Sequence, residues 1–230
     1  MPEGINVLTI VVIAFLVFCA WRGYKKGFLM TVVGIVSVIV SLFAANLFTP
    51  AVTDLVMHNE RVLEKLSLHV EENLEMEDST DKAKQAELIE ALPLPESLKQ
   101  SVLNENSKTT YAEVGVDSFR DYVVYRVAGF VLKAIVFLVL FVIFRLLTLW
   151  IGHALDLVSR LPGLNELNRT AGLLAGALRG FLLLWVLCLV LTVFAATPTA
   201  GQIFAQIEES VILSKIYNNN LLLRAVTEIL

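Results

Sequence analysis

Apolar residues along the chain gather into four long runs instead of recurring at a helical or strand spacing. The runs cover Ile5–Trp21, Gly27–Phe48, Val127–Ile151 and Ala171–Ala196. About 20 consecutive apolar residues in a helix span the hydrocarbon core of a bilayer. The pattern therefore predicts an all-α polytopic membrane protein with four transmembrane helices, and a lipid bilayer as its immediate partner.

The polar segments beside these runs predict how the first two helices connect. Arg22, Lys25 and Lys26 follow the first run, whereas residues 1–4 before it contain neither Lys nor Arg. A cleaved signal peptide has the opposite charge order, so the first run is predicted to be retained and to form a tight hairpin with the second. Thr49-Pro50 is predicted to end the second helix, because proline disfavours helical geometry in the residue before it.

A long polar insert separates the second and third runs. Apolar residues recur there at a helical spacing in residues 53–74, 81–92 and 96–104, which predicts three amphipathic helices. Phe119, Tyr122 and Tyr125 then predict a lead-in to the third span at the membrane interface, where aromatic side chains are enriched.

Two more segments are predicted to be amphipathic. Residues 155–164, broken at Pro162-Gly163, predict a pair of interfacial helices between the third and fourth spans. Ile203, Ile207 and Val211 predict one apolar face on a C-terminal tail, which lies on the bilayer or on its own bundle. The predicted organisation is a hairpin (1–48), an acidic helical insert (49–126), a second pair of spans (127–197) and an amphipathic tail (198–230).

Composition and charge support this picture and add an orientation. The chain is 57% apolar and only 17% charged, with a mean hydropathy of +0.72, which is unlike a soluble domain. Residues 51–126 hold sixteen acidic and eight basic residues. Lys and Arg in short loops favour the cytoplasmic side, so the loops with Lys25 and Arg169 are predicted inside, and the insert and both termini extracytoplasmic. The sequence has no basic stripe of the kind that nucleic-acid binding requires.

Three basic residues lie inside the predicted spans, namely Lys133, Arg145 and Arg179. Charged groups within spans are costly and can mark a polar pathway. Long basic side chains near a helix end can also extend to the headgroups as anchors, and this second interpretation is favoured. For Arg179, a carboxylate near the inner surface, Asp156 or Glu166, is a candidate partner.

The sequence predicts no catalytic, cofactor or metal site. It contains no nucleophile elbow, HExxH motif or phosphate-binding glycine loop. His58 and His69 lie near acidic residues of the insert, but solvated helix faces explain them better than a metal site. Cys19 and Cys188 both lie in apolar runs, which is typical of buried free thiols.

Gly172, Gly176 and Gly180 follow one another at four-residue spacing and so share one face of the fourth span. Small residues on such a face let another helix approach closely. Packing against a neighbouring span of the same chain is favoured over formation of a homo-oligomer.

Two motifs carry a resemblance to a known family. Leu167–Gly180, which includes Asn168 and Arg169, and the segment after the first span resemble the colicin V production protein family. The residues of the second motif are Gly23, Lys25, Lys26, Gly27 and Phe28. The resemblance covers the four spans and not the acidic insert. Asn6 stands where the family often has an aspartate at the start of the first span.

The resemblance implies a bacterial inner or plasma membrane protein linked to the production or export of a peptide toxin and to envelope homeostasis. It also implies an extracytoplasmic C-terminus, because some relatives carry an extracytoplasmic serine protease after the same four spans; residues up to Leu230 are not expected to include one. The expected function is a non-enzymatic scaffold or assembly factor that binds an envelope or export protein through the insert. The alternative is a small oligomeric transporter or channel with Lys133, Arg145 and Arg179 along its route. A membrane-embedded enzyme is the third and weakest alternative.

Overall fold

The computed structural model describes residues 6–57, 60–73, 76–92, 94–154, 166–195 and 197–228. Every regular element in these residues is a helix. The four longest are α1 (Val7–Lys26), α2 (Phe28–Met57), α7 (Phe119–Ala154) and α8 (Glu166–Val193). The insert forms α3 (Glu60–Asn73), α4 (Lys82–Glu90), α5 (Glu96–Asn104) and α6 (Lys108–Val114). The tail forms α9 (Pro198–Glu209), α10 (Val211–Asn218) and α11 (Leu221–Glu228).

The predicted all-α class is confirmed, and so are four helices long and apolar enough to span a membrane. By length and composition, α1, α2, α7 and α8 can each cross a membrane. Their outer faces present large apolar side chains, such as Phe43 at 69% and Trp150 at 73% exposure. A soluble protein rarely leaves such continuous apolar surface uncovered, whereas lipid tails cover it at no cost.

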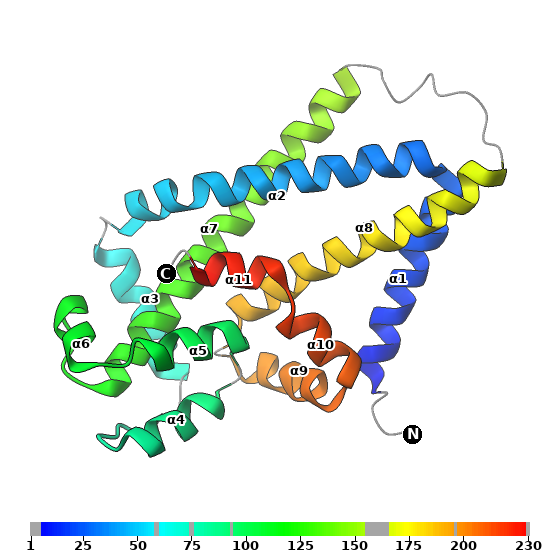
Figure 1. The fold of residues 1–230 in the computed structure, drawn as a ribbon. Coiled ribbons are helices and arrows are strands. Elements are labelled where there is room, and N and C mark those ends of the chain that lie inside the picture. Colours follow the sequence, from blue (N-terminus) through cyan, green and yellow to red (C-terminus); the bar gives the residue numbers. More distant parts are fainter. Residues whose placement is uncertain are drawn as a thin grey trace.

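The insert and the tail lie on the side of the bundle away from the turn between α1 and α2 (Figure 1). α1 packs along α8, while α2 packs against α7 and α8. The start of α1 touches the tail, because Thr9 Oγ1 donates a hydrogen bond to Ser210 Oγ at 2.9 Å. The insert touches the tail as well, with the hydroxyls of Ser97 and Thr227 3.2 Å apart. We call α3–α6 and α9–α11 together the cap.

The prediction that Thr49-Pro50 ends the second helix is wrong, because α2 continues through Pro50 to Met57. Proline removes one backbone donor and crowds the preceding turn, at a cost of about 3 kcal/mol in a helix interior. Thr49 Oγ1 donates a hydrogen bond to the Ala45 carbonyl at 2.7 Å, and Thr49 and Thr53 are buried. Packing of this face holds the helix across the proline, so the predicted insert helix from residue 53 also begins later, at Glu60.

The segment before the third span is also different from the prediction. α7 begins at Phe119, eight residues before Val127, and Phe119 and Tyr122 are buried in protein rather than placed at an interface. Tyr122 Oη donates to the Val102 carbonyl of α5 at 3.3 Å. The start of α7 is therefore the core around which the insert folds.

The tail packs on the bundle, one of the two alternatives the sequence left open. Phe204, Ile207, Leu213 and Tyr217 are buried. Val211 is 65% exposed, contrary to the predicted shared face, because Ser210 ends α9 and caps α10 and so breaks the helical register. The predicted interfacial pair in residues 155–164 lies outside the described residues.

Candidate functional site

The three glycines of α8 lie directly against the backbone of α1. Gly172, Gly176 and Gly180 are buried. A Cβ on Gly172 would lie 2.5 Å from the Gly23 carbonyl oxygen, and a Cβ on Gly176 would lie 2.9 Å from Gly23 Cα. Real Cβ atoms do not come this close to backbone, so only glycine permits the approach. The glycine face is filled by a helix of the same chain.

The turn between α1 and α2 is tied to the start of α8. Gly27 has φ 80°, a left-handed value that favours glycine, and its N–H donates to the Gly23 carbonyl at 2.8 Å. The Phe28 N–H at the start of α2 donates to Asn168 Oδ1 at 3.0 Å. Gly23 and Gly27 on one side and Asn168 and Gly172 on the other therefore form one structural unit, although about 140 residues separate them in the chain.

The basic residues of the same motifs remain on the surface. Lys25, Lys26 and Arg169 are exposed, as is Arg22. Lys25 Nζ lies 3.8 Å from the centre of the Trp21 ring, a cation–π contact. All four cations belong to the end of the bundle opposite the cap. Short-loop Lys and Arg gather on the cytoplasmic side, so their position supports a cap that faces outward.

Arg179 of α8 reaches across to α2. A Cβ on Gly34 of α2 would lie 3.1 Å from Arg179 Nη1, so the guanidinium occupies the space that the missing side chain leaves. Arg179 Nε is buried, and no partner for it is present in the described part of the chain. This position favours an interior role for Arg179 over a headgroup anchor.

Arg145 of α7 approaches α2 one turn further along. Its Nη1 donates a hydrogen bond to Ser37 Oγ. Ser37 Oγ in turn donates to Thr148 Oγ1 at 2.8 Å, and Ser41 Oγ lies 3.3 Å from the same Thr148 atom. Gly34, against which Arg179 lies, and Ser37 are neighbours on the same side of α2. The structure therefore brings these two predicted site residues together.

Lys133, the third basic residue of the spans, is placed elsewhere. It precedes Arg145 by twelve residues, about 18 Å along α7. Lys133 is only 7% exposed, and the charges of Arg126 and Asp54 act on it. Its burial in the middle of α7 does not fit a surface anchor near a helix end.

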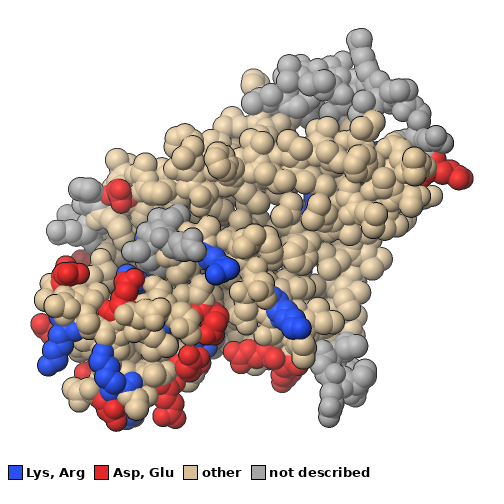
Figure 2. All heavy atoms as spheres, viewed as in Figure 1, with Lys and Arg blue, Asp and Glu red and all other residues tan. Residues whose placement is uncertain are grey.

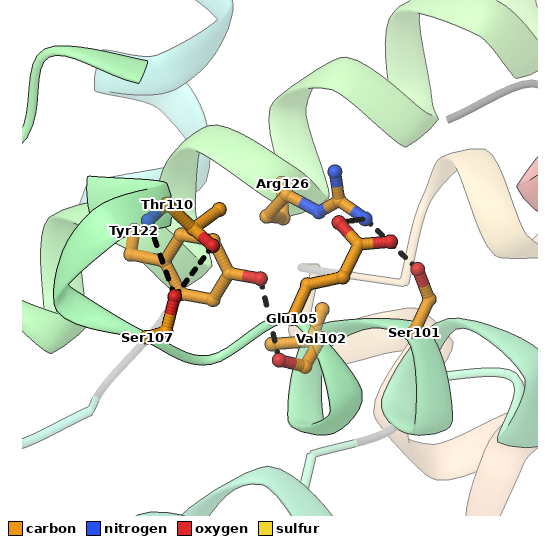
Figure 3. Close-up of polar contacts among 7 residues, drawn as sticks. All are labelled: Ser101, Val102, Glu105, Ser107, Thr110, Tyr122 and Arg126. Carbon is orange, nitrogen blue, oxygen red and sulfur yellow. Dashed lines mark hydrogen bonds and ion pairs between the residues drawn. The ribbon is translucent and has the colours of Figure 1, made fainter. Parts of the chain in front are cut away.

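Polar contacts at the cap were not visible in the sequence. Arg126 Nη2 lies 2.9 Å from Glu105 Oε2 and 2.8 Å from Ser101 Oγ, so it joins α7 to α5 (Figure 3). Next to this contact, a polar groove of about 620 Å³ is lined by residues of α5 and of the tail around α10 and α11. Its lining includes Glu96, Gln100, Asn219 and Arg224.

The tail reaches this groove because it is fixed to α8. Asn220 Nδ2 donates to the Trp185 carbonyl at 2.9 Å. The hydroxyls of Tyr217 and Thr192 lie 2.9 Å apart, and burial raises the pKa of Tyr217 above its ordinary value, so the phenol keeps its proton. Only the apolar spacing of the tail could have suggested this docking from sequence.

The histidines of the insert do not form a metal cluster within the described residues. His69 is exposed on α3, and His58 lies outside the described residues. No group of three His, Cys, Asp or Glu side chains with metal-binding geometry occurs in the described ranges. Glu166 is exposed at the start of α8, away from Arg179, and Asp156 lies outside the described residues.

Comparison with protein families matches the chain to the family described as colicin V production protein, over residues 8–74 and 110–220. The match includes both ends of the insert, so the expectation that the resemblance excludes the whole insert is wrong. Residues 75–109 and the tail beyond residue 220 lie outside it. Comparison with curated proteins and with solved structures gives no match. Two motifs joined in space, four spans and a match over most of the sequence lead to one conclusion: the chain belongs to the colicin V production protein family.

Proposed function

We propose that the protein is a non-enzymatic scaffold or assembly factor of the bacterial inner or plasma membrane, which acts in toxin production or export and in envelope homeostasis. The observation that carries this proposal is the cap. Charged side chains gather over the insert and the tail, while the remaining visible surface is almost free of them (Figure 2). A folded polar cap on an apolar bundle is a suitable surface for a water-exposed protein partner.

The groove between α5, α10 and α11 is the proposed docking position. It is polar and carries both signs of charge, with Glu96 and Arg224 among its lining residues. Exposed charges of this kind set partner choice more than affinity. Two of its walls, α5 and α11, lie outside the family match. The partner is therefore expected to be specific to this protein and its near relatives.

A photocrosslinking amino acid at Asn219, which lines the groove and is exposed, tests this proposal in native membranes. We expect a reproducible adduct with one envelope or export protein. The matched control is the same amino acid at Glu113, which is exposed on α6 and lies outside the groove lining. Equal adducts at both positions, or none at Asn219, would argue against a docking groove.

Transport remains the second candidate function, and one observation favours it. Arg145 and Arg179, from different helices, meet on α2 inside the bundle. A route along all three basic residues would also have to include Lys133, about 18 Å away along α7. Flux of a labelled anion into liposomes that contain the purified protein would decide in favour of transport, and absence of flux would favour the scaffold.

A further inference from the structure

Two arginines from different spans converge on one face of α2. Arg145 comes from α7 and donates to Ser37 Oγ, and Arg179 comes from α8 and lies against Gly34. Gly34 and Ser37 are three residues apart and therefore neighbours on the same side of the helix. Ser37, Thr148 and Ser41 continue the polar cluster next to Arg145.

This cluster carries positive charge without a matching carboxylate in the described ranges. The ion pairs found there join Lys84 to Glu77, Arg120 to Glu71 and Arg126 to Glu105, all in the cap or at its junction with α7. Arg22, at the basic end of the bundle, adds its charge to the field at Arg179. Like charges repel more strongly in a low-dielectric interior than in water, so the arrangement needs a negative charge nearby.

The donors of the cluster are suited to an oxygen anion. A guanidinium is planar, presents five N–H donors and binds carboxylate or phosphate oxygens in pairs. Arg145 uses one of its N–H donors in the hydrogen bond to Ser37, and Arg179 Nε has no hydrogen-bond partner within the described residues. Gly34 lets the Arg179 guanidinium lie against α2, since even a methyl group there would lie 3.1 Å from Arg179 Nη1.

The depth of the cluster limits where an anion could come from. Gly34 lies six residues after Phe28, about 9 Å along α2 from its basic end. An anion could therefore enter from the side that carries Arg22, Lys25 and Lys26, either from solution or as part of a lipid headgroup at that surface.

We propose that Arg145 and Arg179 form a binding site for a phosphate group, held between α2, α7 and α8. The phosphate group belongs to a soluble phosphate or to an anionic phospholipid headgroup. This site is independent of the docking groove, which lies at the other end of the bundle.

Thermal unfolding of the purified full-length protein in a maltoside detergent tests the site. Inorganic phosphate is titrated at constant ionic strength against chloride, and phosphatidylglycerol is titrated into the micelles separately. We expect one of the two to raise the midpoint in a saturable way. A response to inorganic phosphate identifies a soluble ligand, and a response to phosphatidylglycerol alone identifies a lipid headgroup.

Substitutions test whether Arg145 and Arg179 cause the rise in the unfolding midpoint. Arg179→Gln and Arg145→Gln should weaken the apparent affinity about tenfold or more, the usual effect of losing a charged hydrogen bond. Arg169→Gln removes an exposed arginine from the same helix as Arg179 and should leave the response unchanged. If the Gln variants do not fold, Arg179→Lys keeps the charge, removes the planar fork and should still weaken binding.

Two results overturn the proposal. One is the absence of any saturable response to either titrant. The other is a response that Arg169→Gln reduces as much as Arg179→Gln does, which would indicate general attraction to a basic surface. Asp156→Asn identifies the reason in the first case, because loss of stability in that variant would show that a carboxylate of the same chain neutralises the arginines.

Discussion

Gly176 of α8 lies directly against the backbone of α1, and its replacement shows what a side chain there would cost. Its neighbours are backbone atoms of Cys19, Ala20 and Gly23 rather than flexible side-chain ends. Backbone cannot move aside without separating the two helices along their whole contact. Small residues at membrane helix contacts gain van der Waals packing that a larger residue forfeits.

Gly176→Ile should therefore lower the free energy of unfolding by about 1–3 kcal/mol or more. This is the typical cost of adding methylene groups to a tightly packed core. Thermal unfolding in detergent measures this. Leu173→Ile, at a position 41% exposed on the same helix, is the control and should be nearly silent. An unchanged midpoint for Gly176→Ile would show that this face does not pack against α1.

Lys133 gives the opposite case, in which an exchange that conserves charge is expected to be harmful. As a surface anchor it would tolerate Arg, but it is buried at 7% exposure in α7. Buried sites tolerate added volume poorly, and a guanidinium is larger than an ammonium group, so Lys133→Arg should lower the unfolding midpoint in detergent. Lys65→Arg on the exposed face of α3 is the control. Equal midpoints for the two variants would restore the anchor interpretation.

At the scale of whole helices, local sequence rules succeed where nothing competes with them. Residues 96–104 form α5 as predicted, because Pro95 fixes its start and its apolar spacing is clear. The rule that proline ends a helix fails at Pro50, where packing of Thr49 and Thr53 outweighs it. α6 has only seven residues, too few to show a period.

For the candidate sites too, the sequence shows local patterns but not the contacts between distant segments. The sequence shows the glycine spacing and the two motifs, but the contact of Gly23 with Gly172 exists only in the folded chain. Single polar residues in an apolar run have several explanations. Ser37 and Gly34 therefore could not be assigned to Arg145 and Arg179 before their positions were known.

The junction between α2 and α8 provides a test at this scale. Asn168 Oδ1 accepts the Phe28 N–H and, at 3.4 Å, the Leu29 N–H, and so satisfies free donors at the start of α2. Asn168→Ala should cost about 1 kcal/mol, as for other lost N-terminal caps. Asn168→Asp keeps the acceptor and should stay close to the wild type. Urea or thermal unfolding in detergent distinguishes the two variants. Equal losses of stability would show that the hydrogen bonds to Asn168 Oδ1 do not stabilise α2.

For the whole molecule, the central claim is a four-span bundle with a polar cap on the extracytoplasmic side. The hydrogen bonds from α1 to the tail and from the insert to the tail place these segments at one end. The exposed cations Arg22, Lys25, Lys26 and Arg169 lie at the other end. The charge rule for membrane proteins then proposes the side on which each end lies.

Cysteine labelling in intact cells or protoplasts tests this claim most directly, in a parent in which Cys19 and Cys188 are replaced by alanine. Glu87→Cys, exposed on α4, should react with a membrane-impermeant thiol reagent in intact cells. Lys25→Cys, exposed at the opposite end, should react only after lysis. Labelling of Lys25→Cys in intact cells together with protection of Glu87→Cys would contradict the account, because the cap would then face the cytoplasm.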